Sequence, residues 1–317
     1  MTLTELRYIV AVARERHFGR AADACFVSQP TLSVAIKKLE EELGVSIFER
    51  GGVEVSVTPI GNQIVEQAQR VLEHSQTLKE LARVGKDPLS GPLKLGIIYT
   101  IGPYLLPQLV KQIIGQTPQM PLILQENFTV KLLELLRSGE IDVAILAEPF
   151  SETGLVTQAL YDEPFIVAVP KNHELAARDS ISSEELKSQT MLLLGTGHCF
   201  RDHVLEVCPE LSRYSQTNAG IQRTFEGSSL ETIRHMVASG IGITVLPMMA
   251  APKDLADSEH LHYLPFSGAA PSRRIVLAWR KSFTRSAAID AIRRAVLSVD
   301  LSSVTALPNA LVQNHSH

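Results

Sequence analysis

The N-terminal fold is decided by residues 26–44, which read FVSQPTLSVAIKKLEEELG. Ser28 is a favourable helix N-cap, and Pro30 falls in the first turn, where its missing N–H removes no intrahelical hydrogen bond. Gly44 is suited to end the helix. Between these points apolar side chains recur at helical spacing on one face: Leu32, Ala35, Ile36, Leu39 and Leu43. The stretch therefore predicts a helix with one packed face and one free polar face.

Two further helices are expected before this one. Apolar residues at helical spacing run from Leu3 to about Glu15, and an alanine-rich stretch follows from Gly19 to Cys25. Only a tight turn fits between Cys25 and the next helix. This arrangement predicts a helix-turn-helix that reads the DNA major groove, and the alternative is a helical hairpin with a solvated face. Residues 45–58 alternate around two glycines, which predicts a β-hairpin, or wing.

The charge pattern limits how this region could bind DNA. The chain has 30 Lys and Arg against 34 Asp and Glu, a formal net charge of -4, which excludes binding by bulk charge alone. Residues 1–62 hold seven bases and eight acids, but none of those acids lies within residues 26–38. We expect Gln29 and Ser33 to face base edges, with Ser28 and Pro30 at the helix start beside them. Phosphate contacts are expected from Arg20, Thr31, Lys37 and Arg50.

A long helix without proline is expected over residues 61–84. Its small and apolar residues are spaced by four and three, as in a coiled coil: Ile64, Ala68, Val71, Ser75, Leu78 and Ala82. Such a helix is longer than a domain of about 60 residues can cover by itself, so we interpret it as a dimerising linker. Packing within one chain is the alternative. Residues 85–92, rich in Gly, Pro and Ser, are expected to form a hinge.

The remainder of the chain has the pattern of an effector domain. From residue 93 to residue 301 strand-like runs alternate with helical ones, which predicts an α/β domain with parallel strands. A capping box of Ser228 and Glu231 is expected to begin one helix. The polar residues 302–317 are expected to fray. No apolar stretch approaches the roughly 18 residues that cross a bilayer, and the N-terminus lacks a signal-peptide pattern, so the cytoplasm is expected.

The three cysteines, Cys25, Cys199 and Cys208, are too few for a secreted disulfide framework. Cys25 lies in the alanine-rich helix and is expected to be a packed structural thiol. Cys199 begins a predicted helix, where the helix dipole and bases such as His198 or Arg201 would favour the thiolate. A thiolate there could attack peroxide to give a sulfenic acid, which a second thiol can convert to a disulfide.

Cys208 lies nine positions after Cys199. If the intervening chain is helical, the two residues lie on opposite faces about 13 Å apart, whereas a disulfide requires Cα atoms within about 7 Å. A bond between them would therefore require the helix to unwind. Two other interpretations remain open. Both cysteines could be buried structural residues, or a metal ion could bind the set His198, Cys199, His203 and Cys208.

The N-terminal region resembles the DNA-binding domain of LysR-type transcriptional regulators in four stretches: residues 17–22, 27–33, 36–44 and 48–50. The resemblance implies a winged helix-turn-helix, a dimerising linker helix and an effector domain of two α/β lobes like those of periplasmic binding proteins. Other stretches resemble the peroxide-sensing OxyR branch of this family: residues 90–93, 100, 102–107, 197–199, 201–202, 229–232 and 242–244. That branch implies that Cys199 is oxidised and then bonded to Cys208.

Polar residues near Cys199 are expected to support this chemistry. Thr100 and Thr129 each follow a strand-like run, where open α/β sheets place ligands, and with His198 they could hold peroxide. Helix capping is the alternative for Thr129.

Two further residues are assigned to this site. The resemblance implies that an arginine before the last strand favours the thiolate; the sequence does not decide between Arg273 and Arg274, and Arg273 is taken as the candidate. Asp202 could orient a neighbour of the thiolate or simply favour the start of its helix.

The expected protein is a cytoplasmic, homotetrameric regulator that binds double-stranded DNA and hydrogen peroxide and activates antioxidant genes, with RNA polymerase as a further partner. No cofactor, metal or enzymatic activity is expected. Its domains would be residues 1–60 (DNA binding), 61–84 (linker helix), 85–92 (hinge), 93–301 (effector) and 302–317 (tail). The alternatives are a LysR-type regulator that binds a small metabolite between its lobes, and a thiol peroxidase.

Overall fold

The computed structural model describes residues 1–49, 55–84, 87–151, 153–207, 229–252, 254–255, 258–301, 303–308 and 310–314. Arg50, Cys208 and Ser228 lie outside this set. The chain forms two compact units, one of Met1–Lys86 and one made mainly of Asp87–Leu136 and Glu140–His317. Among the described helices, none combines the length and the apolar character needed to span a membrane.

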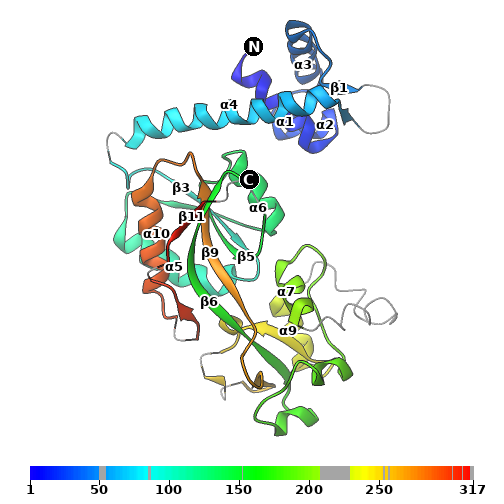
Figure 1. Ribbon diagram of the computed structural model, residues 1–317, viewed down its shortest axis with the longest axis vertical. Helices are drawn as coiled ribbons and strands as arrows, with labels where there is room; N and C mark the ends of the chain where they lie inside the picture. The colour runs from blue at the N-terminus through cyan, green and yellow to red at the C-terminus, as the bar shows by residue number, and fades with distance from the viewer. Residues whose placement is uncertain are drawn as a thin grey trace. The chain divides into compact units, whose positions relative to one another are not determined.

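The N-terminal unit is a winged helix-turn-helix followed by one long helix (Figure 1). Side chains cap the starts of its three short helices: Thr2 for α1, His17 for α2 and Ser28 for α3. Gly44 ends α3 in the left-handed conformation, with φ of 69°, as predicted. The elements are α1 (Leu3–Glu15), α2 (Phe18–Ala24), α3 (Gln29–Leu43), β1 (Phe48–Glu49), β2 (Ser56–Val57) and α4 (Pro59–Val84).

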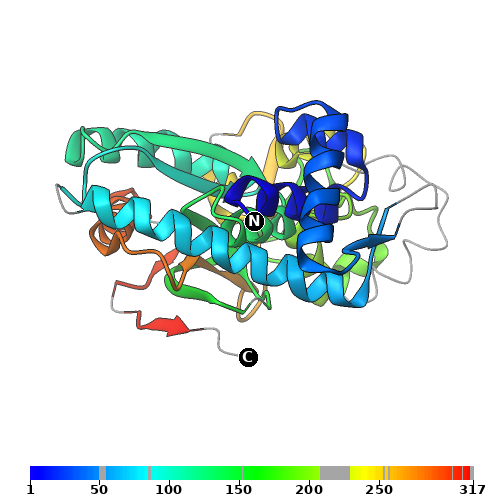
Figure 2. The ribbon, with the colours of Figure 1, turned by 90° about the horizontal axis from the view of Figure 1, so that it is seen from above.

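Helix α4 is continuous (Figure 2), and the early and late parts of its predicted coiled-coil seam differ in exposure. Near its start Ala68 is buried and Ile64 is half-buried, and both pack on the core of the N-terminal unit. Farther along, Val71 and Leu78 are 37% and 69% exposed. The first turns of the predicted seam therefore pack within this chain, and the later turns present apolar side chains that the unit does not cover.

The effector unit contains two lobes with separate hydrophobic cores. The first lobe has a mixed sheet in the order β10-β6-β9-β5-β3-β4. Strand β3 (Leu93–Ile98) pairs in parallel with β4 (Leu122–Asn127) and β5 (Val143–Glu148). Strand β9 (Ser272–Arg280) runs antiparallel to both β5 and β6 (Leu155–Pro170), so the expectation of parallel strands is wrong for this half of the sheet. Helices α5 (Gly102–Gln116), α6 (Thr129–Arg137) and α10 (Ser286–Ser298) belong to this lobe.

The second lobe is built where β6 continues past the first sheet (Figure 1). Residues 165–170 of β6 pair antiparallel with β7 (Thr244–Pro247) and β8 (Leu261–Pro265). Helices α7 (Cys199–Val207) and α9 (Leu230–Ala238) complete its core, with the short helix η4 (Met248–Ala250) after β7. The lobes are also tied by the Tyr104 hydroxyl, which donates to the Glu231 carboxylate at 2.8 Å.

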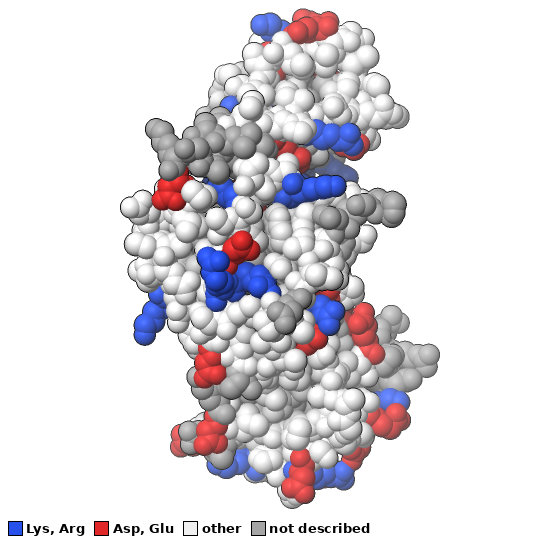
Figure 3. Space-filling view, turned by 60° about the vertical axis from the view of Figure 1, so that its left-hand side comes forward, with Lys and Arg blue, Asp and Glu red and all other residues white. Residues whose placement is uncertain are grey.

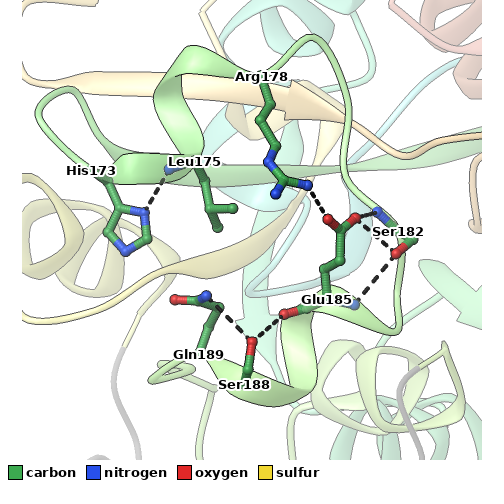
Figure 4. A network of polar contacts seen from close by, with 7 residues as sticks. All are labelled: His173, Leu175, Arg178, Ser182, Glu185, Ser188 and Gln189. Carbon is green, nitrogen blue, oxygen red and sulfur yellow. Dashed lines mark hydrogen bonds and ion pairs between the residues drawn. The ribbon is translucent and has the colours of Figure 1, made fainter.

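A polar network holds the turns at the edge of the second lobe (Figure 4). These turns are the short helices η1 (Glu174–Ala177) and η2 (Glu185–Ser188). The Glu185 carboxylate accepts hydrogen bonds from the Ser182 amide and hydroxyl, both at 2.9 Å, and forms an ion pair with Arg178. Residues 171–189 are thereby ordered without an extended strand or a long helix.

Two expectations about local structure are corrected by the fold. Ser229 rather than Ser228 caps α9, and it accepts from the Thr232 amide, so the expected capping box is wrong. The expected fraying of the C-terminal residues is wrong for β10 (Thr305–Ala306) and β11 (Val312–Asn314), since both pair with β6.

Candidate functional site

A small cavity in the effector unit is lined by three segments that are far apart in sequence. They are the end of β3 with residues 99 and 100, the β4–α6 junction at residues 127–129, and residues 197–199 at the start of α7. Thr100, Thr129, His198 and Cys199 all contribute to its wall. The cavity has a volume of about 10 Å³. This is close to the minimum volume that holds one water molecule.

Two buried polar atoms in this wall have no hydrogen-bond partner among the described residues: Thr129 Oγ1 and His198 Nε2. The two residues are 9% and 5% exposed. Leaving such atoms unpaired costs free energy, and sites of this kind are commonly filled by water or a ligand. Because the Thr129 hydroxyl makes no bond to its own helix, the capping role considered for it is not supported.

The imidazole of His198 is held by aromatic contacts. Its ring centre lies 4.8 Å from that of Phe128 in an edge-to-face arrangement, and Tyr99 lies 6.0 Å away on another side. Gly197 precedes it with φ of 95°, a conformation that favours glycine. Burial lowers the pKa of His198. Its neutral ring can donate or accept a hydrogen bond at the cavity.

Cys199 is the first residue of α7, and this helix packs against both lobes. Cys199 is half-buried against the core of the first lobe, whereas Phe200 and Val204 belong to the core of the second. Two polar contacts fix the helix: Arg201 donates to the Leu194 carbonyl at 3.0 Å, and His203 Nε2 lies 2.9 Å from the Glu148 carbonyl oxygen. A change in α7 would therefore disturb contacts in both lobes.

Arg273 connects the cavity to a buried ion pair. It donates to the Thr100 hydroxyl at 2.8 Å and to the Thr100 carbonyl at 3.1 Å. It also donates to the Glu163 carboxylate at 2.8 Å, and its guanidinium lies 5.0 Å from the centre of the Phe200 ring. Arg274 is exposed and pairs with Asp162 instead. Because neighbouring residues of a strand point to opposite faces, only Arg273 reaches the site.

The other expected site residues are placed differently. Asp202 is exposed in the first turn of α7, away from the lining of the cavity. Cys208 lies outside the described residues, so the structure does not place the second thiol. In the part of the chain that the structure describes, no three metal-ligating side chains cluster, and His203 is already engaged by a carbonyl.

The sequence analysis missed three contributors to this site. Glu163 holds Arg273, and the rings of Phe128 and Phe200 pack on His198 and Arg273. Glu163 carried a usable signal, because it lies two residues before the apolar run at residues 165–169, and an acid that is buried with such a run is rarely without a partner.

Two family models together match most of the chain. Residues 3–62 match the bacterial regulatory helix-turn-helix protein, lysR family, and residues 86–300 match the LysR substrate binding domain. The hydrogen peroxide-inducible genes activator of Pectobacterium carotovorum subsp. carotovorum is 41% identical over 280 residues, 88% of this chain and 90% of that protein. The chain belongs to the LysR family of transcriptional regulators, in its OxyR branch.

Solved structures of OxyR proteins are similar over nearly the whole length of this LysR-type regulator. Full-length OxyR C199D from Pseudomonas aeruginosa is 52% identical with a TM-score of 0.73, over 95% of this chain and 96% of that one. A cysteine mutant of Corynebacterium glutamicum OxyR with hydrogen peroxide bound is 33% identical with a TM-score of 0.63, over 95% and 93% of the two chains.

In this regulator the expected DNA-reading side chains gather at the start of α3. Gln29 and Pro30 are exposed, and Ser33 one turn later is half-exposed. The Ser28 and Thr31 side chains are bonded to each other at 2.7 Å, and Ser28 also accepts from the Thr31 amide, so both stabilise the helix start.

Two of the basic side chains expected to contact phosphate are exposed, and each has a partner within this unit. Arg20 donates to the Glu15 carbonyl at 2.6 Å, and Lys37 lies 3.7 Å from Glu41. Arg50 lies outside the described residues. On the molecular face drawn in Figure 3, basic and acidic side chains lie side by side, in agreement with the mixed charge of the sequence.

Proposed function

We propose that this LysR-type regulator senses hydrogen peroxide at Cys199 and converts the oxidation into a change in DNA binding. One observation carries the proposal. The wall that contains Cys199 also contains two buried polar atoms without partners, Thr129 Oγ1 and His198 Nε2, around a space of about 10 Å³. Hydrogen peroxide has only two heavy atoms, and each of its oxygens can donate and accept, so it would satisfy both atoms beside the sulfur.

The chemistry proceeds in two balanced steps. The Cys199 thiolate attacks one peroxide oxygen, the O–O bond breaks, and hydroxide leaves and takes up a proton to form water. The resulting sulfenic acid condenses with the Cys208 thiol, which releases a second water molecule and forms the disulfide. Arg273 contributes by holding Thr100 in place, because its guanidinium binds both the hydroxyl and the carbonyl of that residue. Asp202 supports the start of α7 through the helix dipole.

The length of α7 supports a conformational switch. The helix runs from Cys199 to Val207, so the Cα atoms of these two residues are about 12 Å apart at 1.5 Å per residue. One further residue spans at most about 3.8 Å, whereas a disulfide requires Cα atoms within about 7 Å. A Cys199–Cys208 bond therefore requires α7 to unwind, and its contacts with both lobes would be lost.

The size of the cavity favours peroxide over a metabolite. Pockets for small organic ligands occupy about 300–1,000 Å³, well above the space beside Cys199. A thiol peroxidase would use the same first step, but it would have no need of the DNA-binding unit. We therefore propose a peroxide-responsive regulator; enzymatic activity, a cofactor and a metal are not part of the proposal.

The partners of the protein follow from the same proposal. Double-stranded DNA would contact Gln29 and Ser33 at base edges, with Ser28, Pro30 and the phosphate-binding set Arg20, Thr31, Lys37 and Arg50 around them. The uncovered turns of α4, with Val71 and Leu78, support pairing of two chains. We propose a homotetramer in the cytoplasm that contacts RNA polymerase to activate antioxidant genes.

The first test is a thiol count and a disulfide map of the full-length protein before and after one equivalent of peroxide. We expect two thiols to be lost and a Cys199–Cys208 bond to appear. Cys199→Ser should abolish both changes while operator binding by the reduced form is retained. Unchanged thiols, or a bond that involves Cys25, would contradict the proposal.

The cavity is tested by Thr129→Val, which removes the unpaired hydroxyl with little change of volume. It should slow thiol loss about tenfold, the value of one hydrogen bond of about 1.4 kcal/mol. Thr284→Val is the matched control, because the Thr284 hydroxyl is also buried without a partner but lies outside this cavity. Equal rates in the two variants would remove the assignment of the cavity.

A further inference from the structure

Arg285, which the redox site does not use, is enclosed by the backbone of the predicted hinge. Its guanidinium donates to four carbonyl oxygens: Pro88 at 3.3 Å, Ser90 at 3.0 Å, Gly91 at 3.4 Å and Pro92 at 3.0 Å. The residue is 5% exposed. The rigid fork of donors of an arginine suits such a set of acceptors, whereas a lysine carries its three donors on one atom.

The enclosed segment is ordered by its own hydrogen bonds as well. Asp87 begins a turn in which the Ser90 amide and hydroxyl both donate to the Asp87 carbonyl, at 3.1 and 2.8 Å. The amides of Gly91 and Leu93 donate to the carbonyls of Gln119 and Pro121, both at 2.9 Å. The described part of the predicted hinge, residues 87–92, is therefore bound to the effector unit and is not a free linker.

The other end of this contact is equally fixed. Arg285 is the N-cap residue of α10, and the apolar face of α10 is buried in the core of the first lobe through Ala288, Ile292 and Val296. Helix α10 also packs against α5. The guanidinium thus extends from a rigid part of the lobe to the backbone that leads to α4.

We propose that Arg285 is the positioning residue that couples the effector unit to the linker helix. Arg285 moves with α10 when the first lobe changes its orientation. Because the guanidinium is bonded to four carbonyls of residues 88–92, this segment moves together with the lobe. This inference rests on the proposed function, because it gives the route by which oxidation at Cys199 would reach the DNA-binding unit.

The test uses Arg285→Lys in the full-length protein, with Arg280→Lys as the matched control. Arg280 is also 5% exposed and donates to the backbone carbonyls of a different segment, those of Leu136 and Ile141, and it lies 4.0 Å from the Asp142 carboxylate. Three quantities are measured for each protein: thiol loss with peroxide, the operator footprint of the reduced and oxidised forms, and amide exchange at residues 90, 91 and 93.

For Arg285→Lys we expect thiol loss at the wild-type rate, loss of the footprint difference between the redox forms, and exchange about tenfold faster at the three amides. Arg280→Lys should keep the footprint difference. A residue that only stabilises the fold would instead lower the thermal midpoint in both variants and leave the footprint difference in the folded protein.

Three results would overturn the inference. They are a retained footprint difference in Arg285→Lys, its equal loss in Arg280→Lys, and slowed thiol loss in Arg285→Lys. If the wild-type footprint itself does not change with oxidation, the proposed function fails together with the coupling. If the wild-type footprint changes with oxidation and the Arg285→Lys footprint changes equally, only the coupling role of Arg285 is contradicted.

Discussion

The candidate functional side chains are exposed and placed by local contacts in the N-terminal unit, whereas they are buried and placed by long-range contacts in the effector unit. At the start of α3, Ser28 and Thr31 bond to each other across three positions, and Gln29 beside them is exposed. In the effector unit, Arg273 and Thr100 are buried and are joined across 173 positions of the chain. Exposed side chains placed by local structure act nearly independently, whereas buried ones share partners, so that losing one leaves another unpaired.

The comparison predicts the largest effect for Glu163→Gln. This change removes the anionic partner of Arg273, with both side chains at most 1% exposed. Breaking a buried ion pair in this way costs about 3–5 kcal/mol. Chemical denaturation of the full-length protein would measure it, and thiol loss with peroxide should slow in parallel because Thr100 loses its support.

Asp162→Asn is the matched control for that change. Asp162 and Arg274 are the direct neighbours of the buried pair on the same two strands, and their contact is solvent-exposed. An exposed pair contributes at most about 1 kcal/mol. If Glu163→Gln and Asp162→Asn lowered the free energy of unfolding by similar amounts, burial would not explain the strength of the Glu163–Arg273 pair.

The second prediction concerns pH. Burial lowers the pKa of His198, and burial together with Arg273 lowers that of His203. The unfolded chain, with histidine pKa values of about 6.5, therefore takes up protons first as the pH falls. The free energy of unfolding should be constant above that value and decrease below it. Urea titrations at several pH values would show this.

A histidine variant sharpens the pH prediction. His203→Gln keeps a donor for the Glu148 carbonyl and should flatten the decrease below about pH 6.5. The same change at the exposed His260 controls for the loss of one histidine. A decrease of equal steepness in wild type and in His203→Gln would contradict the role of burial.

The smallest effects are expected in the DNA-reading unit. Lys37→Ala should weaken binding to all sequences and reduce the slope of log affinity against log salt by about 0.9. Gln29→Ala should instead relax preference at one base pair, by about 1–3 kcal/mol. Titrations of operator and random DNA at several salt concentrations would separate the two. Equal weakening on operator and random DNA by Gln29→Ala would contradict its assignment to a base edge, and unequal weakening by Lys37→Ala would contradict its assignment to phosphate.

Predictability from sequence follows the same division. The bounds of α1 and α3, with the Ser28 cap and the Gly44 end, were predicted because caps and apolar spacing act within one or two turns. The antiparallel position of β9 was not predicted, since strand partners are chosen by contacts across more than a hundred residues. The strands at residues 305–306 and 312–314 were missed because pairing with β6 outweighs the polar composition of this part of the chain.

The sequence alone determined the helix-turn-helix, its free polar face and the α/β effector pattern, and it singled out Cys199 as the candidate reactive thiol. Only the tertiary structure selected Arg273 over Arg274, left the Thr129 and His198 atoms unpaired around one small cavity, and bound Arg285 to residues 88–92. The reason is physical. Local hydrogen bonds and periodic burial can be recognised in a short stretch of sequence, but the burial of a polar group and the identity of its partner depend on segments that meet only when the chain folds.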